Sequence, residues 1–197
     1  MPTRKAYQTL EDRGNYDDVE NYGPYICSQK NAWLGSGFYF WESFIENAHW
    51  WGIEGAAYKN GYLICESKFE LNDEKCFNLI DNPDHIRTFN TIRDTMKQEG
   101  LYVDGKTTVA RIVNQIKEII KVFNYEAIRV YGVNSVGFNS PFSNRTIFYY
   151  RENKKSLQFQ YLDSTPAIQI CFYDKNGLNR KGFKIIHPPE YSEDYLV

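Results

Sequence analysis

Hydrophobic residues along this chain follow a strand-like pattern first, then a helical pattern, then a strand-like pattern again. Over residues 83–98 and again over 108–123, apolar side chains recur every three or four positions. This spacing places them on one side of an amphipathic helix. Gly100 follows the first stretch as a helix stop signal. We therefore predict two helices that form a hairpin packed on a sheet.

Runs rich in β-branched and aromatic residues predict the strands, because these residue types fit a pleated surface. The predicted strands cover residues 5–9, 25–27, 38–42, 61–71, 76–80, 127–131, 146–151, 167–173 and 183–186. Residues 10–23 read as a polar, turn-rich segment, and residues 132–145 and 152–166 read as long polar loops.

A further short helix is predicted directly after the central strand. Ser43 followed three positions later by Glu46 has the spacing of a capping box. Apolar residues continue from there at helical spacing, so we predict a helix over residues 43–51.

The order of strands, helices and strands favours an α+β domain over alternating βαβ units. The 197 residues are enough for one well-buried core and few for two. We therefore predict a single domain over residues 1–197.

Charge and residue composition narrow the classes of partner. The formal net charge is −2, and no stripe of Lys and Arg stands out, so nucleic acid is not an expected partner. The nearest basic segment, residues 145–155, is interpreted as a hairpin with solvated charges. No stretch approaches 18 apolar residues, and the first ten residues do not resemble a signal peptide. We expect a cytoplasmic protein without membrane partners.

Cysteine and histidine residues suggest no metal site. The four cysteines show no CxxC spacing, and the three histidines are scattered along the chain. Buried thiols in a reducing compartment are the expectation for such cysteines.

The most specific stretch is WLGSGFYFWE, residues 33–42. Gly35 and Gly37 give the backbone conformational freedom just before an aromatic strand. Because side chains alternate along a strand, Tyr39 shares a face with Trp41, and Glu42 points to the other face. A phenol at the floor of a cleft could stack on a planar heterocycle. The plainer alternative is that this strand is simply part of the core.

This motif and three weaker ones resemble the signature of a bacterial family in the ADP-ribosyltransferase superfamily. The family's leading Tyr-His strand is matched by Tyr7-Gln8-Thr9, and its LGxGxYFWE strand by residues 34–42. Its later strands are matched by CFNL at residues 76–79 and by QICF at residues 169–172. The order and rough spacing of the motifs agree over most of the chain.

The resemblance implies an ADP-ribosyltransferase-like split β-sheet core with a helical hairpin insertion. It also implies NAD as substrate and an unknown acceptor that could be a protein. Carried over by position, Tyr39 would stack on nicotinamide and Gln8 would stand where the family has the ribose-binding His. Gln169 and Glu42 are candidates for the third polar residue of a catalytic set. The NAD-binding residues implied by the motifs are Tyr7, Gln8, Thr9, Gly37 and Tyr39.

Three hypotheses follow from these residues. The first is an ADP-ribosyltransferase, such as a bacterial toxin or modifier, that uses Tyr39, Gln8 and one carboxylate. The second is a catalytically silent module that binds NAD or ADP-ribose, because an amide is neither an acid nor a base and Gln169 carries no negative charge. The third is an interaction protein that docks a partner through aromatic residues of the loops over 132–166. Besides Glu42, the carboxylates near candidate strands are Glu66 and Glu152.

Overall fold

The computed structural model describes residues 2–28, 32–120, 123–132, 145–149 and 160–191. The strands are β1 (Thr3–Glu11), β2 (Phe38–Glu42), β3 (Tyr62–Glu70), β4 (Cys76–Asn78), β5 (Ala127–Tyr131), β6 (Arg145–Tyr149), β7 (Gln160–Asp163), β8 (Ile168–Phe172) and β9 (Lys181–His187). The α-helices are α1 (Tyr16–Tyr22), α2 (Ile45–Trp50), α3 (Pro83–Gln98) and α4 (Val109–Ile120). A π-helical segment, Trp51–Gly55, follows α2, and 3-10 turns cover Gly177–Asn179 and Pro189–Tyr191.

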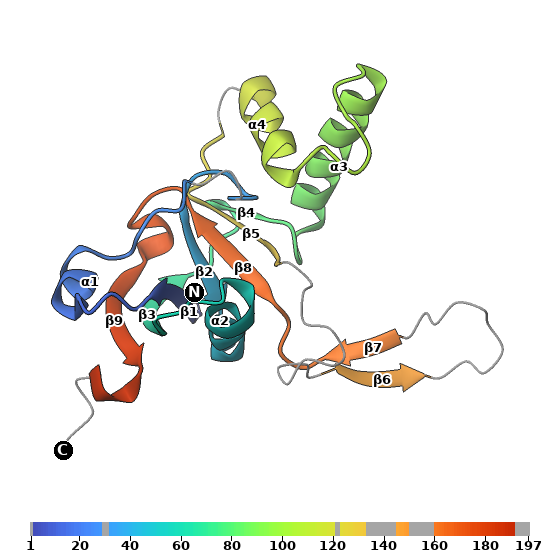
Figure 1. Cartoon of the computed structure of the whole chain (residues 1–197). Coiled ribbons are helices and arrows are strands. Elements are labelled where there is room, and N and C mark those ends of the chain that lie inside the picture. Colours follow the sequence, from blue (N-terminus) through green and yellow to red (C-terminus); the bar gives the residue numbers. More distant parts are fainter. Residues whose placement is uncertain (1, 29–31, 121–122, 133–144, 150–159, 192–197) are drawn as a thin grey trace.

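Seven of these strands form one open mixed sheet in the order β4-β5-β8-β2-β1-β3-β9. The pairing of β4 with β5 is parallel, and the other pairings given for this sheet are antiparallel. Strands β6 and β7 pair separately and form a ribbon that projects from the body (Figure 1). The predicted α+β class is confirmed.

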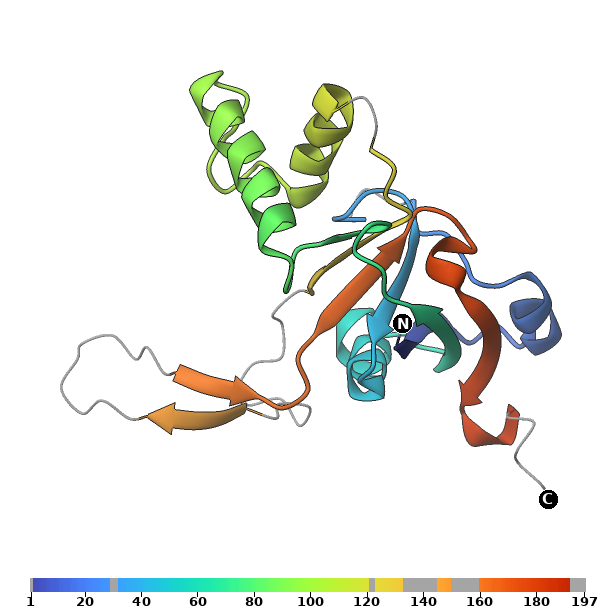
Figure 2. The same cartoon turned by 180° about the vertical axis from the view of Figure 1, so that it is seen from behind.

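The strand register defines two faces of the sheet. The first face carries Ala6, Phe40 and Phe172, and its core is covered by Val19 of α1 and by Leu178. The second face has two clusters of apolar side chains. One lies under α2 and includes Tyr7, Trp41 and Trp50, and the other lies under α3 and α4. The view from behind shows the two helices of the hairpin side by side at one end of the sheet (Figure 2).

The helical hairpin forms where the apolar spacing predicts it, and α3 has the predicted bounds, 83–98. Its start is fixed by Asn82, whose side chain accepts hydrogen bonds from the backbone N–H groups of Asp84 and His85, and by Pro83 in the first turn. Helix α4 buries Ile112, Val113 and Ile116 against the second face.

Four local predictions were wrong. The strand predicted over 25–27 does not form, and within it only Cys27 makes an isolated bridge, with Gly37. The capping box at Ser43 does not form, because Ser43 has a φ of 65° and α2 begins after Phe44 with no side-chain cap. The segment predicted as turns over 10–23 contains α1, which buries only Val19 and therefore lacks a helical apolar pattern. The loop predicted over 152–166 contains β7; most of both predicted long loops lies outside the described residues.

Candidate functional site

Tyr39 of β2 holds the glycine-containing loop that precedes its strand. Its hydroxyl donates to the Gly35 carbonyl at 2.7 Å and accepts from the Leu34 backbone N–H at 2.8 Å. Gly35 has a φ of 93°, a conformation that favours glycine. The ring is half-buried on the second face, and this burial raises the pKa of the phenol well above its usual range. Tyr39 is therefore a neutral ring with a fixed position.

Gly37 is required by close approach. A β-carbon at this position would lie 2.4 Å from the Cys171 Sγ atom and 2.7 Å from the Phe172 carbonyl oxygen. The Gly37 backbone also pairs with Cys27 in an isolated bridge. Glycine thus lets three chain segments meet directly beside Tyr39.

Gln169 of β8 lies on the same face as Tyr39. In the register, Tyr39 is opposite Cys171 and Trp41 is opposite Gln169, and residues directly opposite each other share a face. The buried Gln169 amide oxygen accepts a hydrogen bond from the Trp33 indole nitrogen at 2.8 Å. Tyr39 and Gln169 therefore both hold the loop from Trp33 to Gly35.

Gln8 lies elsewhere, on the first face. It pairs with Cys65 of β3, which belongs to the first-face core. Its amide nitrogen donates to the carbonyls of Tyr25 and Tyr39, at 2.9 and 3.3 Å, and its oxygen accepts from the Tyr25 N–H at 2.9 Å. All these contacts are to backbone groups. Gln8 therefore positions the backbone around Tyr39 from the first face, opposite the Tyr39 ring.

The neighbours of Gln8 on β1 face the side of α2. Tyr7 is buried against Trp41 and Trp50, and the Thr9 hydroxyl donates to the Ala48 carbonyl at 2.9 Å. Both side chains therefore anchor α2 to the sheet.

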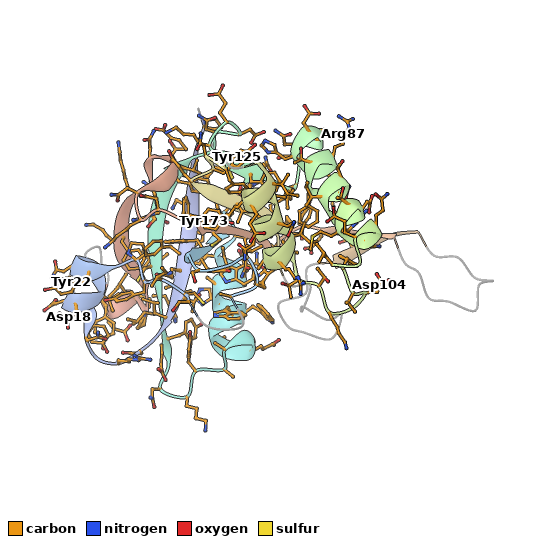
Figure 3. The ribbon with its side chains drawn as sticks, turned by 90° about the horizontal axis from the view of Figure 1, so that it is seen from above. Asp18, Tyr22, Arg87, Asp104, Tyr125 and Tyr173 are labelled. Carbon is orange, nitrogen blue, oxygen red and sulfur yellow. The ribbon has the colours of Figure 1, made fainter. Side chains whose placement is uncertain are left out.

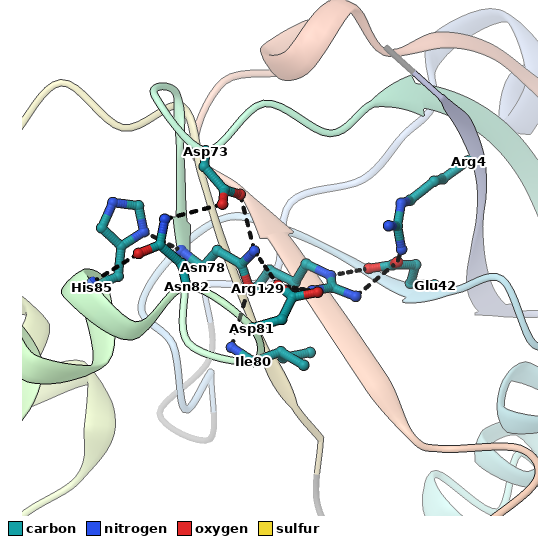
Figure 4. Close-up of polar contacts among 9 residues, drawn as sticks. All are labelled: Arg4, Glu42, Asp73, Asn78, Ile80, Asp81, Asn82, His85 and Arg129. Carbon is teal, nitrogen blue, oxygen red and sulfur yellow. Dashed lines mark hydrogen bonds and ion pairs between the residues drawn. The ribbon is translucent and has the colours of Figure 1, made fainter.

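Glu42 also lies on the first face, opposite Ala6 in the register. It is fully buried and accepts hydrogen bonds from Arg129 at 2.6 and 3.2 Å, and a further one from Arg4. Figure 4 shows its carboxylate between the two guanidinium groups. Two positive charges and three hydrogen bonds fix Glu42 as a structural anion.

The charged network extends beyond Glu42 to the end of β4. The Arg129 Nη1 atom donates to Asp81 at 3.0 Å and to Asn78 at 3.2 Å. Asn78 in turn donates to Asp73 and Asp81 (Figure 4). The network ties β2, β5 and β4 together on the face opposite Tyr39.

Of the other carboxylates considered from the sequence, Glu66 pairs with Lys5 at 2.8 Å, and Glu152 lies outside the described residues. The arrangement thus brings Tyr39, Gly37 and Gln169 together, and it places the side chains of Gln8 and Glu42 on the opposite face of the sheet.

Sequence reasoning did not assign a role to Trp33, Tyr173 or Lys117. The Tyr173 hydroxyl donates to the Leu34 carbonyl at 3.4 Å, and the Lys117 ammonium lies 4.0 Å from the centre of the Tyr173 ring. Trp33 could have been found, since it opens the glycine motif. Lys117 could not, because it comes from the hairpin, 78 positions beyond Tyr39 in the chain.

Described residues line at least two cavities. One, of about 510 Å³, opens at the edge formed by β3 and β9 and is lined by charged side chains of both signs, among them Glu66, Lys68 and Lys181. The other, of about 250 Å³, lies between α3, α4 and β4 and has aromatic walls.

No family model, curated protein or solved structure matches this chain. Within the described ranges, no helix is long and apolar enough to cross a membrane. In the same ranges, no three His, Cys, Asp or Glu side chains are grouped so that they could hold a metal ion. The four cysteines are free thiols, and three of them are buried.

Proposed function

We propose that this chain is an NAD-binding module of the ADP-ribosyltransferase type that binds the dinucleotide without transferring ADP-ribose. Tyr39 would stack on the nicotinamide ring, and the Gln169 amide would bind a ribose hydroxyl. The free thiols fit the cytoplasmic location that we propose with it.

The observation that supports binding is the placement of Tyr39 and Gln169. Tyr39 of β2 is opposite Cys171 of β8, and Gln169 lies two positions from Cys171 on the same strand, so the two side chains are diagonal neighbours on one face. Diagonal neighbours in a sheet are about 7–8 Å apart. One ligand can span that distance with a ring on Tyr39 and a sugar at Gln169. Tyr39 and Gln169 are also held by the same loop, so little conformational entropy would be lost when a ligand binds.

The position of Glu42 argues against transfer. A cation-like sugar in the transition state needs a nearby negative charge. Glu42 lies on the opposite face, and its charge is already balanced by Arg4 and Arg129. Transfer to an acceptor would therefore need a carboxylate other than Glu42.

Calorimetric titration with NAD tests this proposal. We expect saturable binding, and we expect Tyr39→Leu to weaken it about tenfold or more, because an aromatic stack on a planar base contributes about 1–3 kcal/mol. Tyr39→Phe keeps the ring but loses the hydroxyl that holds the loop, so it should weaken binding less than Tyr39→Leu does. Tyr22→Leu, at an exposed position on α1, is the matched control and should change nothing.

Two outcomes would overturn the proposal. Absence of saturable NAD binding would remove the nucleotide site. Release of nicotinamide from NAD during prolonged incubation, measured by chromatography, would show turnover and restore the transferase hypothesis.

A further inference from the structure

The cavity between α3, α4 and β4 has the features of a site for a flat ring. Its walls include Phe77, Phe123 and Tyr125, and Ile116 of α4 completes the apolar lining. The three aromatic rings contact one another, with centroids 4.9 to 5.7 Å apart. Aromatic walls of this kind suit the stacking of a planar heterocycle.

The other three of the seven lining residues are polar, so the lining is mixed. Thr88, Asn124 and Glu74 contribute a hydroxyl, an amide and a carboxylate. A pocket that combines aromatic walls with polar groups can hold a ring and fix its orientation. The volume of about 250 Å³ is small for a whole dinucleotide and suits one ring system.

Lys117 of α4 lies close to one wall of this cavity. Its ammonium is 5.1 Å from the centre of the Phe123 ring, which lines the cavity, and 4.0 Å from the centre of the Tyr173 ring. Figure 3 shows Tyr125 and Tyr173 beside α4, the helix that carries Lys117. The side chain is half-buried, and this burial lowers the pKa of the ammonium.

Within the described residues, Lys117 forms no ion pair with a carboxylate. Lys97 on the same hairpin differs, since it lies over Tyr102 but also approaches Asp104 at 3.8 Å. A desolvated cation without a counter-charge favours an anionic ligand.

Contacts connect Lys117 with the proposed nicotinamide site. The Tyr173 ring under Lys117 carries the hydroxyl that donates to the Leu34 carbonyl, and the Leu34 N–H donates to the Tyr39 hydroxyl. Lys117 therefore lies between the cavity and Tyr39 on the second face.

We propose that the cavity between α3, α4 and β4 binds the adenine ring of NAD and that Lys117 binds the phosphate groups of the same ligand. This inference rests on the proposed function, because it assigns the second half of the same dinucleotide. Phe123 forms the wall shared by the ring and the phosphate subsites.

The test uses AMP and adenosine as separate probes in calorimetric titrations. Lys117→Met removes the charge and keeps an apolar stem, so we expect AMP and NAD to bind about tenfold more weakly and adenosine to bind unchanged. Lys97→Met is the matched control and should leave all three affinities unchanged. Thr88→Phe, which places a ring in the cavity, should weaken AMP and adenosine alike.

The outcomes separate this inference from the proposed function. If NAD binding depends on Tyr39 but is indifferent to both Lys117→Met and Thr88→Phe, the cavity assignment is overturned and the proposed function stands. If AMP binds through Lys117 and the cavity while nicotinamide mononucleotide does not bind, the nicotinamide site is overturned and the cavity assignment stands. If neither AMP nor adenosine binds at millimolar concentration, the cavity is not a nucleotide site.

Discussion

Strand β2 directs aromatic side chains to one face of the sheet and a buried carboxylate to the other. Tyr39 and Trp41 belong to the second face, and Glu42 belongs to the first. The alternation of side chains predicts this separation from the sequence alone. The sequence could not predict what neutralises Glu42, because Arg129 lies 87 positions away and reaches it only through the sheet.

Replacing Glu42 should cost much of the stability of the fold. Glu42→Gln would leave Arg129 buried without its main counter-charge, and breaking a buried ion pair in this way costs about 3–5 kcal/mol. Urea unfolding followed by fluorescence would measure the loss. Glu66→Gln is the matched control, because its pair with the exposed Lys5 should contribute less than about 1 kcal/mol. Equal losses in the free energy of unfolding for the two variants would mean that the buried network stabilises the fold no more than an exposed ion pair does.

At the scale of elements, local sequence signals predicted the helical hairpin and β5 well. Helix α3 has both a periodic apolar pattern and a strong start at Asn82 and Pro83, so local and tertiary preferences agree. Helix α1 was missed because a seven-residue helix with one buried side chain has no periodicity to read. The pairing of β4 and β5, and hence the place of Asn78 beside Arg129, depends on contacts distant in sequence.

Strand β4 is an edge strand, and His85 of α3 protects it. The His85 Nδ1 atom accepts from the Asn78 backbone N–H at 3.0 Å, so it carries no proton, and the Nε2 atom lies 3.1 Å from the Tyr125 hydroxyl. Occupying an edge N–H in this way discourages pairing with another chain. Burial lowers the pKa of His85 below its ordinary value of 6.5, against the attraction of Asp73 and Asp84.

This contact predicts a pH dependence of stability. Because the folded pKa of His85 is lowered, the unfolded state takes up a proton first as the pH falls. The contribution of His85 is therefore complete above about pH 6.5 and is lost as the pH falls through the folded pKa. His85→Asn keeps a short acceptor that cannot titrate, so its free energy of unfolding should fall less steeply between pH 7 and 5 than that of the wild type. Part of the slope should remain, since burial also lowers the pKa values of His49 and His187. Identical slopes of unfolding free energy against pH for variant and wild type would contradict the assignment of an unprotonated His85 Nδ1 atom in the folded state.

At the scale of the whole molecule, the sheet separates structural charge from the candidate site. The first face carries the Glu42 network, and the second face carries Tyr39, Gln169 and the cavity beneath the hairpin. Helix α4 connects the cavity with the loop beside Tyr39 and Gln169, since the backbone N–H of Ala110 donates to the Trp33 carbonyl at 3.1 Å. Composition and local pattern predicted an α+β chain, but the meeting of hairpin and glycine loop depends on the three-dimensional fold.

This division predicts that stability and ligand affinity can be changed independently. Arg4→Met removes one charged hydrogen bond to Glu42 on the first face and should lower the free energy of unfolding by about 1.5–3 kcal/mol. It should leave the NAD affinity unchanged at temperatures where the variant is folded, because none of the groups proposed to bind NAD contacts Arg4. Gln169→Leu should show weaker NAD binding, because the amide proposed to bind the ribose is lost and the Trp33 indole loses its acceptor. Titration of both variants beside their unfolding curves measures the two effects separately. A loss of affinity in Arg4→Met as large as that in Gln169→Leu would show that the two faces are coupled and that binding depends on the buried charges.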